Sequence, residues 1–381
     1  MAITSLLFSD SFGHYDDTSL KWTIAGGSIS TANPRTGTRC LDIGASAGHP
    51  GAATYGNITV GAAFRVPTEG TLQRTLLDAL NTDYAETTFS LRQEVDGAVS
   101  LLVLGAVVAT SVPGVMVAEK YTYLEVAVHF FQEEIHVFAT GEDNITAEIL
   151  NQPIVVPNPY VQVVMFGGTA GGGTDWEGKI ADVYLAAWDG ADPKTLSAPR
   201  IYCCMPIEDG HVLIGAFSPV QTDAFADAGA PGPYVPLVSA VPEDTSTFIE
   251  ELEVVVDDVE QGMNICGRAF KVDVSGVPPG STIAALQCNI LYQFSAGETT
   301  ALNFADAGVL LPRTNESDPI NWWRAFGQNQ PVNVLDFPNE TSIYKFAYSP
   351  NVADDNGLPF DLADFTGPSA WQFGPWVGQS S

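Results

Sequence analysis

Apolar and polar residues alternate with a period of two along much of this chain, which is the pattern of half-buried β-strands. The clearest alternation starts at Tyr121, is interrupted by a predicted turn at 131–134, and resumes as far as Phe138. The apolar face of this predicted hairpin carries Thr122, Leu124, Val126, Val128, Phe130, Ile135 and Val137. Helical periodicity is nearly absent, so the pattern predicts an all-β fold.

Short predicted strands, separated by Gly, Pro, Asn and Asp, fill the first half of the chain. They cover 6–8, 39–43, 57–66, 87–93 and 99–108. Strands this short with turns this frequent are typical of a sandwich or a jelly roll. We therefore predict one β-sandwich over residues 1–198.

The stretch 161–202 is predicted to complete that first domain. It contains a strand, the glycine-rich loop 167–173, and a second strand through Asp182-Val183-Tyr184-Leu185. Prolines then mark an exit, at Asp192-Pro193 and Ala198-Pro199. We interpret this stretch as a structural joint between two domains rather than as a binding site.

The remaining residues, 199–381, are predicted to form a second β-sandwich in tandem with the first. Proline and glycine continue to break the chain, and strands are predicted at 252–259, 283–294 and 343–347. The strand 283–294 alternates clearly and places Cys288 on its apolar face, so this cysteine is expected in the core.

Charge excludes several classes of function. The chain has 45 acidic and 15 basic residues, a net charge of −30, which repels nucleic acid and anionic membranes. No apolar run approaches the ~20 residues that span a bilayer, and the N-terminus lacks the pattern of a signal peptide. The five cysteines match no zinc or redox spacing and are expected to be buried free thiols. No nucleic acid, membrane insertion or cofactor is therefore expected.

Three motifs contain residue types that are found in metal-binding, catalytic or phosphate-binding sites. His129 and His136 are predicted to lie opposite one another on the exposed face of the hairpin. A solvated pair is the favoured interpretation; the alternative is a metal site that Glu125 or Glu134 completes. Gly44-Ala45-Ser46-Ala47-Gly48 matches a nucleophile elbow, but the following His49-Pro50-Gly51 cannot open the required helix. The glycine-rich loop lacks the lysine and helix of a phosphate cradle. None of these motifs predicts an enzyme.

Two segments carry a resemblance to known proteins. The opening DSFGHYDDTSLKWT, from Asp10 to Thr23, resembles the start of many bacteriophage virion proteins, often tail-associated. The stretch Asp175-Trp176 to Tyr184 resembles the end of the laminin G / concanavalin A-like jelly roll, and the exit through Arg200 resembles that of the same virion proteins. The resemblance implies such a jelly roll over residues 1–198.

The second half carries weaker signals of the same resemblance. It has a Pro242-Glu243-Asp244-Thr245-Ser246 turn, and its end leads to Phe373-Gly374, as in phage tail proteins. The segment 320–331 matches no such pattern. It contains neighbouring aromatic residues that could form a subunit interface or stack on a sugar, and the candidate contact residues are Trp322, Trp323, Arg324 and Phe326.

The sequence thus favours a non-enzymatic structural component of a bacteriophage particle, tail- or fibre-associated. Such a protein would be made in the host cytoplasm and located in the virion. Its expected partners are other virion proteins, further copies of itself and, for host attachment, a surface glycan. A capsid decoration protein and a carbohydrate-binding module for cell-surface glycans are the two alternatives.

Overall fold

The computed structural model describes residues 3–13, 22–24, 27–43, 47–50, 57–67, 73–80, 87–153, 161, 163–167, 178–202, 204, 206–217, 263–284, 287–292, 304–310, 342–347, 361–372 and 374–379. Within these residues the chain is all β apart from one short 3₁₀ helix, which confirms the predicted fold class. Two compact units are distinguished: unit 1 holds Met1–Cys203 with two short later pieces, and unit 2 holds the rest.

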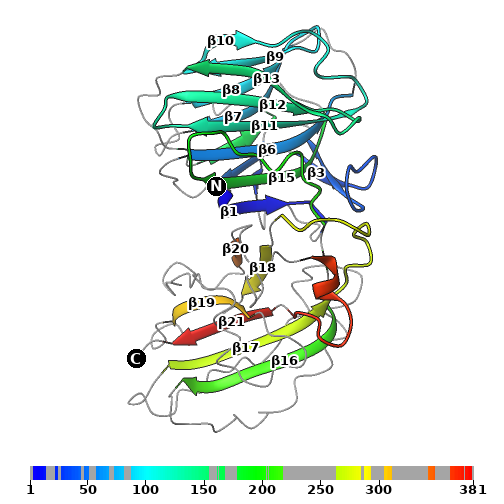
Figure 1. Cartoon of the computed structure of the whole chain (residues 1–381), viewed down its shortest axis with the longest axis vertical. Helices are drawn as coiled ribbons and strands as arrows, with labels where there is room; N and C mark the ends of the chain where they lie inside the picture. The colour runs from blue at the N-terminus through cyan, green and yellow to red at the C-terminus, as the bar shows by residue number, and fades with distance from the viewer. Residues whose placement is uncertain are drawn as a thin grey trace. The chain divides into compact units, whose positions relative to one another are not determined.

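Unit 1 contains two antiparallel sheets (Figure 1). Sheet A consists of β1 (Ile3–Asp10), β3 (Ser28–Ser30), β4 (Cys40–Ile43), β6 (Asn57–Arg65), β11 (Tyr121–His129), β12 (Glu134–Thr140), β13 (Thr146–Pro153) and β15 (Gly178–Trp188). Its order is β13-β12-β11-β6-β15-β4-β3, and β1 also pairs with β15. The strand that was predicted to close the domain therefore lies inside this sheet.

Sheet B has seven strands in the order β10-β9-β8-β7-β14-β5-β2. They are β2 (Thr23–Ile24), β5 (Ala47–Pro50), β7 (Arg74–Leu80), β8 (Thr87–Gln93), β9 (Val99–Val103), β10 (Ala106–Thr110) and β14 (Val163–Phe166). The prediction of a single strand over 99–108 was wrong, because Leu104 and Gly105 have φ values of 48° and 79°. Two left-handed residues in succession form the tight turn of a β-hairpin.

The two sheets of unit 1 share one hydrophobic core, which makes the unit a β-sandwich. The predicted apolar face of the hairpin is confirmed, since Leu124, Val126 and Val128 are buried in it. Sheet B contributes Phe89 and Leu91, among others, from the opposite side. Burial of this many large side chains supplies the main driving force for folding.

The opening motif folds into a compact corner of this core. Asp10 ends β1 and accepts hydrogen bonds from the Phe12 N–H and from Trp22 Nε1, both at 2.7 Å. The Phe12 and Trp22 rings stack with centroids 5.5 Å apart, and both side chains are buried. These three residues of the motif therefore have a structural role.

Unit 2 contains a four-stranded sheet and a two-stranded sheet. The first has the order β16-β17-β21-β19 and the second pairs β18 with β20. The strands are β16 (Pro206–Phe217), β17 (Met263–Val272), β18 (Gln287–Tyr292), β19 (Phe304–Leu310), β20 (Ser342–Ala347) and β21 (Gly374–Gln379), and the 3₁₀ helix η3 is Leu362–Phe365. Strands were correctly predicted near 283–294 and 343–347, whereas 252–259 lies outside the described residues. The second sandwich stays a prediction.

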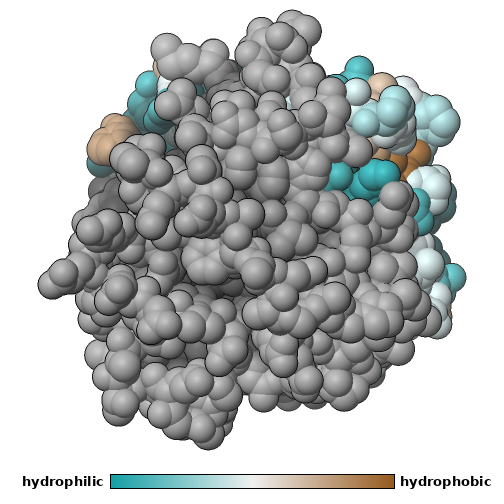
Figure 2. Space-filling view, turned by 90° about the horizontal axis from the view of Figure 1, so that it is seen from below, coloured by the Kyte–Doolittle hydropathy of each residue, from teal (hydrophilic) through white to brown (hydrophobic). Residues whose placement is uncertain are grey.

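Figure 2 shows one face, on which the described residues that are visible are coloured mainly teal and white, with some brown. Only 16% of the chain is charged, so uncharged polar groups must supply much of this surface.

Candidate functional site

The outer face of sheet A binds the segment that leaves the sandwich, which we call the exit segment (residues 189–201). His129 Nε2 lies 3.0 Å from the carbonyl oxygen of Gly190. The Thr59 hydroxyl donates to the carbonyl of Lys194. This face was predicted to be solvated, but the exit segment lies against it.

Glu125 holds the middle of the exit segment. Its carboxylate is 1% exposed and accepts hydrogen bonds from the backbone N–H groups of Leu196 and Ala198, each at 3.0 Å, and from the Tyr184 hydroxyl. Burial raises the pKa of Glu125, and these hydrogen bonds act in the opposite direction. A β-carbon on Gly61 would lie 2.2 Å from Cε1 of Tyr184, so a glycine there makes room for the ring.

Asp182 holds the end of the exit segment, and a β-bulge in β15 directs its carboxylate. The bulge gives Asp182 a φ of 51°, a left-handed conformation that aspartate tolerates better than most residues. The carboxylate accepts from the Thr36 hydroxyl at 2.7 Å and the Ile201 N–H at 3.1 Å, and it pairs with Arg35. Burial raises the pKa of Asp182, and Arg35 is the largest influence that opposes this shift.

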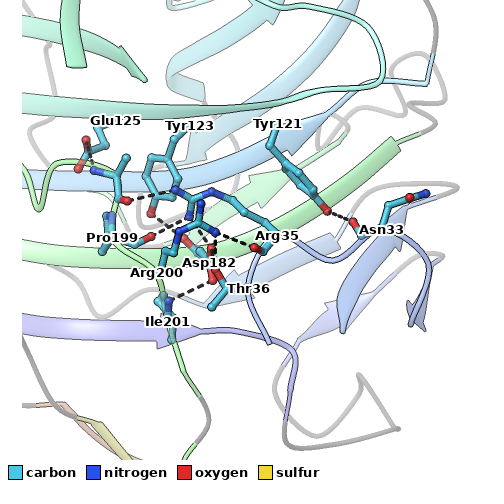
Figure 3. Close-up of polar contacts among 11 residues, drawn as sticks. Asn33, Arg35, Thr36, Tyr121, Tyr123, Glu125, Asp182, Pro199, Arg200 and Ile201 are labelled. Atoms are coloured by element: carbon cyan, nitrogen blue, oxygen red, sulfur yellow. Dashed lines mark hydrogen bonds and ion pairs between the residues drawn. The ribbon is translucent and has the colours of Figure 1, made fainter. Parts of the chain in front are cut away.

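Arg35 connects that carboxylate to the exit segment (Figure 3). Its guanidinium donates to the carbonyls of Pro199 at 2.8 Å and Ala198 at 3.1 Å, and lies 4.6 Å from the centre of the Tyr123 ring. Arg200 in turn donates to the Arg35 carbonyl at 2.7 Å. Because these groups satisfy one another, the cluster fixes the exit segment to sheet A.

The predicted histidine pair is not formed. The register of β11 and β12 places His129 opposite Glu134 and His136 opposite Ala127, so the predicted pairing was wrong by two residues. The turn starts one residue earlier than predicted, at Phe130. Both histidines are buried rather than solvated.

Each histidine has its own partners. Besides Gly190, the His129 ring accepts the Gln132 N–H at 3.0 Å and lies edge-on to Trp188. His136 Nδ1 is 2.6 Å from a carboxylate oxygen of Glu148. In the part of the chain that the structure describes, no group of three His, Cys, Asp or Glu is arranged to hold a metal ion.

The outer face of sheet B contains a buried carboxylate with a spare oxygen. Along β7, Leu77 and Ala79 enter the core, so the alternation directs Asp78 to the opposite face. Asp78 is only 1% exposed, yet its Oδ2 has no hydrogen-bond partner among the described residues. Burial raises the pKa of Asp78 to about 6, against the lowering effect of a hydrogen bond from Ser90.

Cross-strand pairing defines the surroundings of Asp78. Ser90 and Met165 flank it directly, and Leu102 follows beyond Ser90. The next row on this face is Thr75, Arg92, Ser100 and Thr110. Met165, Leu102, Thr75 and Arg92 are partly exposed, so this face reaches solvent. Asp78 thus lies beneath this face, where Thr75 and Thr110 bring hydroxyl groups toward the surface and Ser90 and Ser100 are buried.

Chemically, this arrangement fits the binding of a hydrogen-bond donor. An unpaired buried carboxylate costs stability, whereas an apolar residue at the same position would not. Buried ionisable groups that lower folding stability in this way are often found at functional sites. The Asp78 carboxylate and its hydroxyl-bearing neighbours are groups that can hydrogen-bond a ligand.

The residues predicted from sequence fall elsewhere. Trp322, Trp323, Arg324 and Phe326 lie outside the described residues, as do Ser46 and most of the glycine-rich loop. After Ser46 the chain forms β5 instead of a helix, so the context of a nucleophile elbow is missing.

Sequence reasoning missed Asp78 altogether. Its signal is a single acidic residue between apolar neighbours in Arg74-Thr75-Leu76-Leu77-Asp78-Ala79-Leu80.

Taken together, the described residues define an all-β protein whose unit 1 is a two-sheet antiparallel sandwich. No described helix has the length and apolar character needed to cross a membrane. No protein-family model matches the sequence, and no curated protein matches it.

Solved structures with a similar fold include lectins. Lectin II from Ulex europaeus is 9% identical, with a TM-score of 0.33 over 47% of this chain and 97% of its own. The metal-free VIP36 exoplasmic/lumenal domain is 11% identical, with a TM-score of 0.36 over 49% of this chain and 97% of its own. A sialidase is 14% identical, with a TM-score of 0.35. The match covers 47% of this chain and only 19% of the sialidase chain.

TM-scores this low do not transfer a ligand or an activity to this chain. Nothing in the comparisons shows a bacteriophage origin, so the virion assignment stays a prediction. The same holds for the absence of enzymatic activity.

Proposed function

We propose that this chain is a non-enzymatic carbohydrate-binding protein, and that unit 1 binds its ligand on the outer face of sheet B. The observation that supports this is the spare Oδ2 of Asp78 among hydroxyl-bearing neighbours. Adjacent hydroxyls of a sugar donate well to an ionised carboxylate, and such charge-assisted hydrogen bonds are about twice as strong as neutral ones.

A neutral sugar suits this face better than an anionic ligand. The net charge of −30 repels phosphates and nucleic acids. Thr110 is exposed, and its hydroxyl, which bonds that of Ser100 at 2.8 Å, has a further hydrogen-bonding position for a sugar hydroxyl. The partly exposed Leu102 and Met165 supply apolar contacts for the C–H groups of a sugar ring.

The test is binding of the full chain to an array of cell-surface glycans, followed by calorimetry on each hit. Asp78→Asn is expected to weaken binding about tenfold or more, since it removes the charged acceptor. Asp192→Asn, at an exposed carboxylate of the exit segment, is the matched control and should bind as the wild type does. Undiminished binding by Asp78→Asn would refute the site, and an array without hits would refute the function.

The pH dependence provides a second measurement. Only the ionised carboxylate accepts hydrogen bonds through both oxygens, so affinity should rise as pH increases through about 6.

Trp323→Ala tests the aromatic segment predicted from sequence. A loss of binding confined to that variant would move the glycan site to unit 2.

A second candidate is a structural component of a bacteriophage virion, tail- or fibre-associated or a capsid decoration. The resemblance of the opening segment supports it, and so does exposed apolar surface at Leu104, Val107 and Val108, which suits assembly. Antibody labelling of purified virions would locate the protein on head or tail. Absence of the protein from purified particles would exclude this candidate.

A further inference from the structure

The outermost strand of sheet B is an open edge. β10 pairs with β9 on one side, and no described strand pairs with its other side (Figure 1). An open edge presents unpaired N–H and C=O groups to any extended chain that approaches it. Apolar side chains on β10 are exposed as well: Val107 is 48% and Val108 43% exposed.

This edge lacks the charged residues and proline that commonly protect an edge strand against association. Proteins normally guard an edge strand with charged residues or proline. No charged residue occurs anywhere in 97–117, a stretch that includes β9, β10 and the turn between them. Pro113 lies beyond the strand, and the register shift in β10 falls between Val107 and Ala109, where it leaves both valines exposed.

Charge indicates which partner can use this edge. Two copies of a chain with a net charge of −30 repel each other over most of their surfaces. They avoid that repulsion only where each copy contributes a neutral surface, and the stretch 97–117 is one. An edge strand is also self-complementary, because two copies can pair antiparallel about a two-fold axis.

We propose that a second copy of this chain pairs with it through β10, so that sheet B continues from one copy into the other. In this arrangement Val107 and Val108 of both copies lie close to the two-fold axis and exclude water from the new hydrogen bonds. A five-residue strand buries less area than the ~800 Å² per partner of a standard interface, so the dimer is weak. This inference is independent of the proposed sugar site.

The experiment is sedimentation equilibrium of the full chain over a range of concentrations. We expect a monomer–dimer equilibrium with a dissociation constant of about 10–100 μM. Val108→Lys should weaken it at least tenfold, because it places two positive charges side by side near the axis. Phe131→Lys is the matched control, since Phe131 is 82% exposed in a different turn, and it should leave the equilibrium unchanged.

Two further measurements separate edge pairing from other association. Raising the salt concentration should strengthen the dimer, because it screens the repulsion between acidic surfaces. Hydrogen exchange of β10 amides should slow as protein concentration rises, and this slowing should be absent in Val108→Lys. A wild type that stays monomeric at ~200 μM would overturn the proposal. So would a dimer that resists Val108→Lys without protection of β10.

Discussion

The guanidinium of Arg35 lies 4.6 Å from the centre of the Tyr123 ring. The same guanidinium pairs with Asp182 in the bulge of β15 and donates to two carbonyls of the exit segment. A cation over an aromatic ring is stabilised by the electrons of the ring face. A single side chain thus connects a loop, two strands of sheet A and the exit segment.

Removal of Arg35 is expected to destabilise unit 1 strongly. Arg35→Ala leaves the carboxylate of Asp182 buried without its cation, which typically costs about 3–5 kcal/mol. Urea denaturation monitored by tryptophan fluorescence measures the change in the free energy of unfolding. Arg65→Ala is the control, because its partner Glu119 is exposed and such a pair contributes about 0–1 kcal/mol. Equal losses in the two variants would contradict the role assigned to Arg35.

Gly61 is expected to tolerate no side chain while Tyr184 is present. In Gly61→Ala the new methyl group would meet the tyrosine ring at 2.2 Å, and displacement of the ring should cost about 1–3 kcal/mol. Thermal unfolding of the single variant tests this. Gly141→Ala, where the nearest atom is 3.4 Å away, should change stability little.

A double variant identifies the cause of any loss at Gly61. Tyr184→Leu combined with Gly61→Ala should cost less than the sum of the two single changes, because the clash disappears. Additive costs would show that the ring is not what excludes the side chain.

Asp78 makes stability depend on pH. Its pKa rises from 3.8 to about 6 on folding, so its favourable contribution is complete below about pH 4 and is lost as pH increases through about 6. At 1.36 kcal/mol per pKa unit, the loss is at most about 3 kcal/mol.

Asp78→Asn should remove this dependence, since an amide does not ionise. Unfolding free energies of both proteins between about pH 4 and 7.5 measure it, and the variant should gain on the wild type as pH rises. Asp192→Asn should show no such gain. A constant difference between Asp78→Asn and wild type across this range would contradict the assignment.

Much of unit 1 could be predicted from local pattern. The alternation from Thr122 to Val128 correctly gave the side of β11 that faces the core between the sheets, and the strand 87–93 was predicted at its observed bounds. Both follow from side chains that alternate between core and exterior. Cys40 was expected to be a buried free thiol, and the structure confirms this.

The errors arise where distant segments determine the structure. The exposure of His129 could not be predicted, because the exit segment that covers it comes some sixty residues later. The register of the hairpin depended on where a four-residue turn begins, and the alternation fits two choices that differ by two residues. The surroundings of Asp78 are formed by residues of β8 and β14. The sequence alone does not show which strands pair with β7, so these surroundings could not be predicted from it.

The bulge at Asp182 finally affects how unit 1 meets its surroundings. By anchoring Ile201 and, through Arg35, Pro199, it keeps the exit segment against the outer face of sheet A. The exit segment thereby covers the part of that face formed by β6, β11 and β15, whereas Glu148 on β13 stays exposed. New contacts added on the outer face of sheet B, or at the β10 edge, leave the anchoring bonds of Asp182 and Arg35 intact.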